Sequence, residues 1–214
     1  MRITISKENY LKAIAEAEAE GEDVKAVTLT RWLRVSAPAV TMAIKRLKRD
    51  GLIRVGAEGQ IALTPPGREI ATRLLNRHLL IERMLAEIFG LEWYKVHDEA
   101  EQLEHAVSAD FERKLAEKLG AGGPCPHGNI VGMDSPAHRR RIGLRPLDEA
   151  AAGETVAVAS VFERDRELLE YLDHLGIRPG VTLCVEVSGR DVEVRSGNGP
   201  VRLPKTAASK VWVR

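Results

Sequence analysis

Imidazoles and carboxylates recur at close spacing in the segment HDEAEQLEH, between His97 and His105. In a helix, His97, Glu101, Glu104 and His105 fall at i, i+4, i+7 and i+8, within one stripe about 100° wide. Carboxylate oxygens mixed with imidazole nitrogens suit Mn²⁺, Fe²⁺ or Zn²⁺. Charged residues also crowd the solvated faces of ordinary helices, so this segment alone leaves both interpretations open.

A second His–Glu pair lies upstream in RHLLIERMLAEIF, where His78 and Glu82 are four residues apart on a predicted helix. Such a pair is most often an ordinary surface contact between side chains one helical turn apart. A turn around Gly90 would let the two predicted helices face each other. Their polar side chains would then close one or two metal sites between the helices.

The composition is that of a globular chain with room for two or three small domains. The 214 residues are 44% hydrophobic and 4% aromatic, and 32 basic against 31 acidic residues give a net charge of +1. The low aromatic content argues against binding of single-stranded nucleic acid by base stacking. Because the net charge is close to zero, any nucleic-acid site must be a local basic patch. Two cysteines, Cys125 and Cys184, argue against a disulfide framework. With no run near the length of a membrane span, we expect a cytoplasmic protein.

Residues 1–72 are predicted to form a winged helix-turn-helix. After a first helix over ENYLKAIAEAEAEG, a short helix at about residues 29–33 leads through a turn to a helix that Ser36 caps. Two alternating strands follow, at residues 52–55 and 60–64, on either side of a glycine-rich turn. These strands make the wing.

The second helix of such a motif enters the DNA major groove, with its N-terminal residues at the base edges. Short polar side chains there reach bases or phosphates, apolar ones contact thymine methyl groups, and surrounding basic residues contact phosphates. The alternatives are a small structural winged helix that binds no DNA, or a Lys/Arg run that is a solvated face. The predicted DNA-contacting residues are Arg31, Ser36, Ala37, Pro38, Thr41, Met42, Lys45, Arg46 and Arg49.

The rest of the chain divides into a helical and a β-rich segment, so the predicted fold class is mainly α with small β. Residues 73–138 hold the metal-ligand candidates and apolar surface for dimerisation, which a winged-helix protein needs to span two half-sites. Residues 139–147 are predicted to be a linker. Residues 148–214 carry short alternating runs between glycines and prolines, and they predict a small five-stranded barrel.

Cys125 and His127 lie two residues apart in PCPHGN, a spacing that invites a zinc interpretation. No second pair with zinc-like spacing follows, and Cys184 lies far along the chain. We therefore interpret this segment as a structural turn.

Nearly the whole chain resembles the iron- and manganese-dependent repressor family of DtxR, IdeR and MntR. The shared motifs are ENYLKAI, SAPAV, LKRDGLI, LTPPGREIA, RHLLIERML, GLEWYKVHDEAEQLEH and CPHGN. The last region resembles the SH3-like, FeoA-type domain of the longer members. The resemblance implies a non-enzymatic homodimer, with one or two dimers per operator, that binds operator DNA when Fe²⁺ or Mn²⁺ is present. In the family, metal binding orders the N-terminal helix and sets the spacing of the two winged helices. A metal ion can do this only if it binds the DNA-competent state more tightly than the other state.

The resemblance also implies two metal sites per subunit. The ancillary site falls on His78, Glu82 and His97, and two residues of the last domain complete it, at the positions of Ser160 and Glu163. Ser160 replaces an acidic residue of the family. Glu163 replaces an amide and is a competent ligand.

The primary, regulatory site falls on Asn9, Glu101, Glu104 and His105. The Glu101 position is Cys in iron-type members and Glu in manganese-type ones, so an all-oxygen-and-nitrogen site favours Mn²⁺. Asn9 stands where the iron type has Met and the manganese type has Asp, and it matches neither pattern. Lys12 replaces a ligand carboxylate of the binuclear manganese type.

The leading hypothesis is therefore a metal-dependent repressor that controls metal homeostasis, with Mn²⁺ favoured over Fe²⁺. One alternative is a metal-independent winged-helix regulator, which the departures at Asn9 and Ser160 motivate. Another is a carboxylate-bridged metalloenzyme in the helical middle, which would need an open, substrate-sized pocket.

Overall fold

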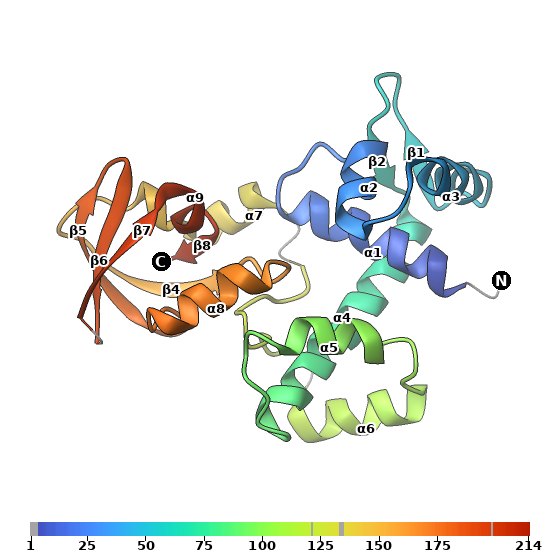
Figure 1. Cartoon of the computed structure of the whole chain (residues 1–214). Helices are drawn as coiled ribbons and strands as arrows, with labels where there is room; N and C mark the ends of the chain where they lie inside the picture. The colour runs from blue at the N-terminus through green and yellow to red at the C-terminus, as the bar shows by residue number, and fades with distance from the viewer. Residues whose placement is uncertain (1–3, 121, 133–134, 198) are drawn as a thin grey trace. The chain divides into compact units, whose positions relative to one another are not determined.

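The computed structural model describes residues 4–120, 122–132, 135–197 and 199–214 (Figure 1). The chain forms two compact units, which are described separately. The first spans Met1–His78 and Val131–His138, and the second spans Leu79–Ile130 and Arg139–Arg214. None of the described helices is long and apolar enough to cross a membrane.

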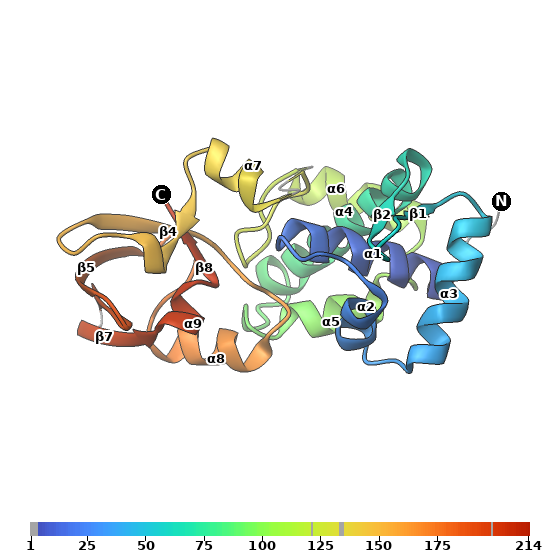
Figure 2. The same cartoon turned by 90° about the horizontal axis from the view of Figure 1, so that it is seen from above.

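The first unit is a winged helix-turn-helix, as predicted. Thr4 caps its first helix by accepting a hydrogen bond from the backbone N–H of Lys7, and Ser36 caps the recognition helix in the same way from Ala39. Figure 2 shows α3 with one side open at the edge of this unit. The elements are α1 (Ile5–Ala19), α2 (Ala26–Leu33), α3 (Ala37–Arg49), β1 (Ile53–Val55), β2 (Ile61–Leu63) and the first part of α4 (Pro65–Glu87).

Leucine, isoleucine and valine side chains from α1, α2 and α3 form the core of this unit. Leu11, Leu29 and Leu47 are fully buried, one from each helix. Helix α2 begins three residues before the predicted start, because the Lys25 N–H donates to Thr28 Oγ1 and satisfies a free amide at the helix start. The periodicity of apolar residues does not reveal that extra turn.

The start of α4 packs tightly against the wing. The Leu52 carbonyl accepts the Thr64 N–H at 3.0 Å, and the Thr64 hydroxyl donates to the Gly51 carbonyl at 2.7 Å. A Cβ atom on Gly67 would lie 2.0 Å from the Leu52 oxygen. Only glycine lets the helix approach the backbone just before β1 this closely.

The second unit continues α4 and adds α5 (Val96–Leu103) and α6 (Ala109–Leu119). The single helical stripe considered for His97 to His105 is interrupted, because α5 ends at Leu103 and the next two residues lie in a turn. Ser108 then caps α6, its hydroxyl accepting from the Phe111 N–H at 3.2 Å.

The apolar residues around this turn divide between core and surface. Ala100 is fully buried, as expected for the inner face of α5. Leu103 and Phe111 are 37% and 47% exposed, so they add little to the core of their own chain. They provide apolar surface of the kind that dimerisation needs.

The C-terminal part of this unit is a six-stranded antiparallel sheet in the order β3-β8-β4-β5-β6-β7. The sequence predicted five strands because β3 has two residues and β7 begins and ends near prolines, which weaken the strand signal. The core consists of valines and leucines from alternate strand positions. The elements are α7 (Pro136–Arg141, shared with the first unit), β3 (Arg145–Pro146), η1 (Leu147–Glu149), β4 (Thr155–Val161), α8 (Arg166–His174), β5 (Thr182–Ser188), β6 (Asp191–Ser196), β7 (Gly199–Pro204), α9 (Lys205–Ala208) and β8 (Val211–Val213).

Replacing Gly67 with alanine should lower the free energy of unfolding by about 1–3 kcal/mol, because the added methyl group overlaps the Leu52 carbonyl. The loss should appear even though alanine favours a helix by about 1 kcal/mol over glycine. Urea unfolding followed by circular dichroism measures it. Gly189→Ala is the control, since a Cβ there meets no atom within 4 Å. Equal stability of both variants would contradict the tight packing.

Candidate metal centre and DNA interface

Glu82 on α4 is fully buried and lies between two imidazole rings. Its Oε1 is 3.1 Å from His97 Nδ1, and its Oε2 is 3.5 Å from His127 Nδ1. The two rings lie 6.3 Å apart between centroids. Each oxygen of this carboxylate therefore faces a different ring.

Glu163, in the segment after β4, repeats this arrangement from the other side. Its Oε1 is 3.8 Å from His97 Nδ1, and its Oε2 is 3.6 Å from His127 Nδ1. Asn129 Nδ2 donates to the same Oε2 at 2.5 Å. The two carboxylates thus bridge the two imidazole rings in parallel.

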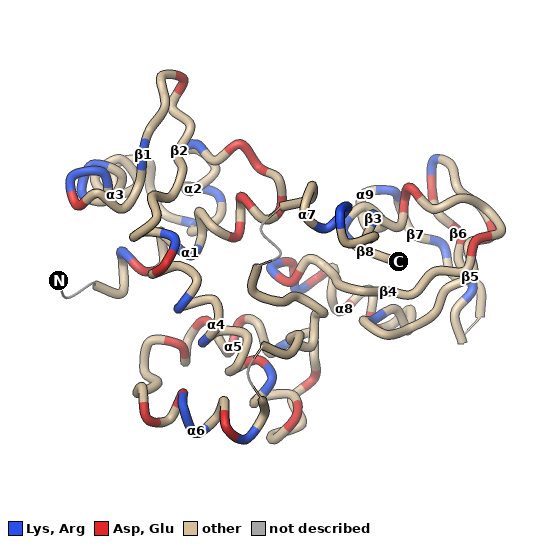
Figure 3. Tube along the Cα trace, turned by 180° about the vertical axis from the view of Figure 1, so that it is seen from behind, with Lys and Arg blue, Asp and Glu red and all other residues tan. Residues whose placement is uncertain are grey.

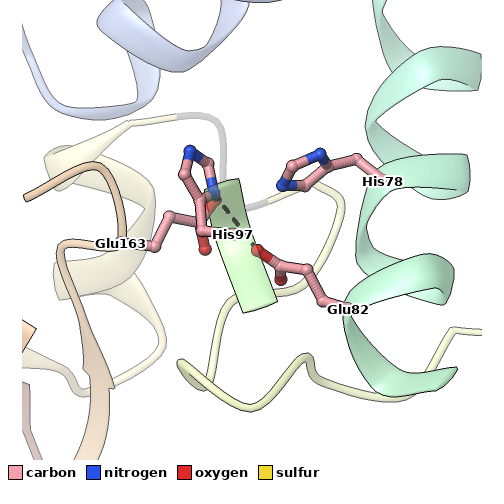
Figure 4. A group of neighbouring side chains, drawn as sticks. All are labelled: His78, Glu82, His97 and Glu163. Carbon is pink, nitrogen blue, oxygen red and sulfur yellow. Dashed lines mark hydrogen bonds and ion pairs between the residues drawn. The ribbon is translucent and has the colours of Figure 1, made fainter. Parts of the chain in front are cut away.

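His78 lies one helical turn before Glu82 on α4 and is fully buried. One potential ligand atom from each of His78, Glu82, His97 and Glu163 lies within 4.8 Å of the other three (Figure 4). Buried and partly buried carboxylates and imidazoles gathered at this distance have the donor types and spacing of a divalent metal site. The family resemblance had implied an ancillary site of these four residues together with the position of Ser160.

A second group of ligand atoms shares both carboxylates. Glu82, Cys125, His127 and Glu163 also offer atoms within 4.8 Å of one another. The Cys125 thiol is 3.6 Å from Glu163 Oε2 and 3.7 Å from His127 Nδ1. The sequence argument had treated Cys125 and His127 only as a turn, although their two-residue spacing was the available signal.

The CPHGN segment forms a turn, and it also supplies the two potential metal ligands Cys125 and His127, so we call it the donor loop. The Cys125 N–H donates to the Asn129 carbonyl at 2.9 Å, and Gly128 adopts a φ of 81°. A Cβ on Gly128 would lie 2.0 Å from the Ala159 carbonyl oxygen on β4. Glycine therefore lets the loop lie against the strand from which the chain runs on to Glu163.

The backbone fixes which nitrogen of His127 can bind a metal. Its Nε2 lies 2.8 Å from the Trp93 carbonyl, which can only accept, so Nε2 carries a hydrogen. Nδ1 is then the atom directed at Glu82, Glu163 and Cys125. Metal-binding histidines commonly donate their other ring N–H to a carbonyl in this way.

Positive charge at His97 balances the buried carboxylates in the metal-free protein. Burial alone would lower the pKa of His97. Hydrogen bonds to Glu101 and Glu82, with the negative charges of Glu163 and Glu82, outweigh it and raise the pKa from 6.5 to about 10. Burial, with the charges of Glu82 and Glu163, raises the pKa of the Cys125 thiol well above its usual value. Both shifts favour the protonated form of the group, an imidazolium at His97 and a neutral thiol at Cys125.

The predicted primary set draws on both units and stays a prediction. In the second unit, Glu104 is buried and its Oε1 lies 3.5 Å from His105 Nε2. Glu101 Oε1 lies 3.6 Å from His97 Nε2 and accepts from Arg164 Nη1 at 2.9 Å. Asn9 is half-buried on α1 in the first unit.

Lys12 and Ser160, two residues that depart from the family pattern, are both buried. Lys12 is buried on α1, with its Nζ 2.9 Å from His78 Nδ1 and 3.8 Å from Glu16 Oε1. The resemblance had implied that Lys12 replaces a ligand carboxylate of the binuclear manganese type. Ser160 is fully buried on β4, and its hydroxyl has no hydrogen-bond partner among the described residues.

The predicted DNA-contacting residues lie on or near α3. All of those on α3 and its cap are exposed, and Met42 is 49% exposed. The Thr41 hydroxyl donates to the Ala37 carbonyl at 2.9 Å, so its oxygen and methyl group remain for DNA. Arg31 pairs with Glu22, and Arg49 with Asp50. Figure 3 shows lysines and arginines concentrated along α3, which fits a phosphate-contacting surface.

A winged helix-turn-helix and a buried His–Glu–Cys cluster in one chain define the class of metal-responsive DNA-binding regulators. Three family models match in succession: "Iron dependent repressor, N-terminal DNA binding domain" over residues 2–59, "Iron dependent repressor, metal binding and dimerisation domain" over 64–131, and "FeoA domain" over 145–214. The chain belongs to the family of iron-dependent repressors.

Individual relatives agree over nearly the full length. The iron-dependent repressor IdeR of Mycobacterium leprae is 32% identical, with 96% of this chain and 95% of that protein covered. The diphtheria toxin repressor of Corynebacterium glutamicum is 33% identical, with 89% and 88% covered. A solved manganese-dependent transcriptional repressor in complex with manganese is 32% identical, with 97% and 98% covered and a TM-score of 0.84.

The raised pKa of His97 predicts a loss of stability in alkaline solution. A protonated His97 stabilises the metal-free fold fully below pH about 6.5, and this contribution is lost as the pH rises through about 10. In chelator, the free energy of unfolding should therefore fall between pH 7 and 10. His97→Gln should lack this decline. The control His174→Gln, at an exposed position, should keep it; a wild-type decline in His97→Gln would contradict the assignment.

Proposed function

We propose that the chain is a metal-activated transcriptional repressor that binds operator DNA as a homodimer and controls metal-ion homeostasis. The observation that carries the proposal is the buried group of Glu82, His97, His127 and Glu163, whose carboxylates each face both rings. Net negative charge buried in this way calls for a cation. A DNA-binding chain that holds such a cluster can couple cation binding to DNA affinity.

Mn²⁺ is the proposed activator of the primary site, with Fe²⁺ as the second candidate. Glu101, Glu104, His105 and Asn9 would offer oxygen and nitrogen donors without a thiolate, which suits a hard cation. The solved relative named above is manganese-dependent, and IdeR of Mycobacterium leprae is iron-dependent. Both relatives support the choice of these two metals as candidates. As a regulator of operator DNA, the protein would act in the cytoplasm.

The ancillary cluster would offer two neighbouring positions that share Glu82 and Glu163. One position adds the imidazoles of His78 and His97, and the other adds the Cys125 thiolate and the His127 ring. Thiolate with imidazole favours softer ions such as Zn²⁺ over Mn²⁺. A metal ion at the position with Cys125 and His127 would bind the thiolate. The Cys125 thiol must therefore lose its proton, and metal binding favours that loss.

DNA binding would use α3 in the major groove of each half-site. Ser36, Ala37, Pro38, Thr41 and Met42 would face the bases, with Lys45, Arg46, Arg49 and Arg31 at the phosphates. The exposed Leu103 and Phe111 would contribute to the surface that pairs two protomers, with one or two dimers on an operator.

Operator binding should require metal. We expect the full-length protein to bind DNA from upstream of its own gene at least about tenfold more tightly with Mn²⁺ than with chelator, a coupling of about 1.4 kcal/mol or more. Glu104→Ala should abolish this gain because it removes a ligand, while Lys45→Ala should weaken binding in both conditions because it removes a phosphate contact. Gel-shift or anisotropy titrations measure both.

Each alternative predicts a different result in the same titration. Equal binding in chelator would support a metal-independent winged-helix regulator and overturn the proposal. Tighter binding with anaerobic Fe²⁺ than with Mn²⁺ would keep the regulator and overturn the metal assignment. Turnover of a substrate together with metal-independent DNA binding would point to the metalloenzyme alternative.

Cys125 should bind softer metals directly. Co²⁺ added anaerobically to the metal-free protein should give a near-ultraviolet thiolate-to-cobalt charge-transfer band, because Cys125 lies within the second ligand group. The band should vanish in Cys125→Ser. It should persist in the control Cys184→Ser, which alters the exposed cysteine on β5. A band that instead depends on Cys184 would contradict the proposed position.

A further inference from the structure

Arg164 connects the FeoA-type domain to α5. It follows Glu163 in the segment between β4 and α8, and its Nη1 lies 2.9 Å from Glu101 Oε1. Its side chain is only 17% exposed, whereas that of Glu101 is 39% exposed. Consecutive residues of one segment thus direct a carboxylate into the buried cluster and a guanidinium onto Glu101.

The same oxygen of Glu101 takes part in a second contact. Oε1 also lies 3.6 Å from His97 Nε2, so one carboxylate oxygen lies near both the guanidinium and an imidazole ring. The guanidinium keeps its positive charge at any ordinary pH.

We propose that Arg164 is a positioning residue that holds Glu101 in the metal-free protein and competes with the metal ion for it. The inference rests on the proposed function, in which Glu101 is a ligand of the primary site. A dication at Glu101 would face a fixed positive charge at hydrogen-bond distance, so the guanidinium must give up this oxygen before the metal binds. The FeoA-type domain would thereby raise the metal concentration at which the repressor is activated.

Removing the charge of Arg164 should strengthen metal binding. We expect Arg164→Gln to lower the Mn²⁺ dissociation constant of the Glu101-dependent site by about tenfold. Arg164→Lys keeps the charge and should bind Mn²⁺ within about twofold of the natural protein. Electron paramagnetic resonance of free Mn²⁺ during titration of the full-length dimer measures affinity, and circular dichroism verifies folding.

Arg166 offers a matched control. It pairs with Glu170 at 2.9 Å and with Asp98 on α5 at 3.6 Å, but with no proposed metal ligand. Arg166→Gln should therefore leave Mn²⁺ affinity unchanged, while it removes a charge from the same segment. A merely structural role for Arg164 would weaken metal binding in Arg164→Gln rather than strengthen it.

A double-mutant cycle separates failure of this inference from failure of the proposed function. If Arg164 acts through Glu101, Arg164→Gln should have no effect on Mn²⁺ binding once Glu101→Gln is present. If Glu101→Gln weakens Mn²⁺ binding but Arg164→Gln alone leaves it equal or weaker, the competition is overturned and the repressor proposal stands. If Glu101→Gln leaves Mn²⁺ binding unchanged, Glu101 is not a ligand, and the proposed primary site and this inference both fail.

Discussion

The Glu82 carboxylate has no solvent exposure, and a charge in that position must be matched by positive charge in contact with it. The raised pKa of His97 favours an imidazolium there, with Nδ1 3.1 Å from Glu82 Oε1. Three elements meet at this carboxylate. Helix α4 carries it, α5 brings His97 against its Oε1, and the CPHGN loop places His127 beside its Oε2. The segment after β4 adds a second carboxylate, so the C-terminal domain takes part in the same balance of charge.

The sharing of Glu82 and Glu163 has a chemical consequence for selectivity. Two donor sets, one with only oxygen and nitrogen atoms and one with a thiol, depend on the same two carboxylates. An ion in either set draws electron density from oxygens that the other set needs. In our proposal the identity of the ion is therefore decided by competition within one cluster, as well as by the primary site, where Glu101 would offer an oxygen donor.

Sequence reasoning was most successful where the signal is local. The cap at Ser36, the apolar face of α3 and the glycine-rich turn of the wing each lie within a few residues of what they determine. The meeting of distant segments was predicted only where the family resemblance supplied it, as for His78, Glu82, His97 and Glu163. Nothing near Arg164 indicates that it reaches Glu101, and the spacing of Cys125 and His127 does not show which carboxylates they meet. The helix break after Leu103 was missed because the ligand spacing fits a continuous helix equally well.

Trp93 joins the donor loop to the C-terminal domain. Its carbonyl accepts from His127 Nε2 at 2.8 Å, its indole N–H donates to Asp173 on α8 at 2.6 Å, and its ring lies 5.8 Å from the His127 ring. Indole emission responds to the polarity around the ring. Trp93 is one of three tryptophans in the chain, so once Trp32 and Trp212 are replaced its emission can follow occupancy of the donor loop without an added label.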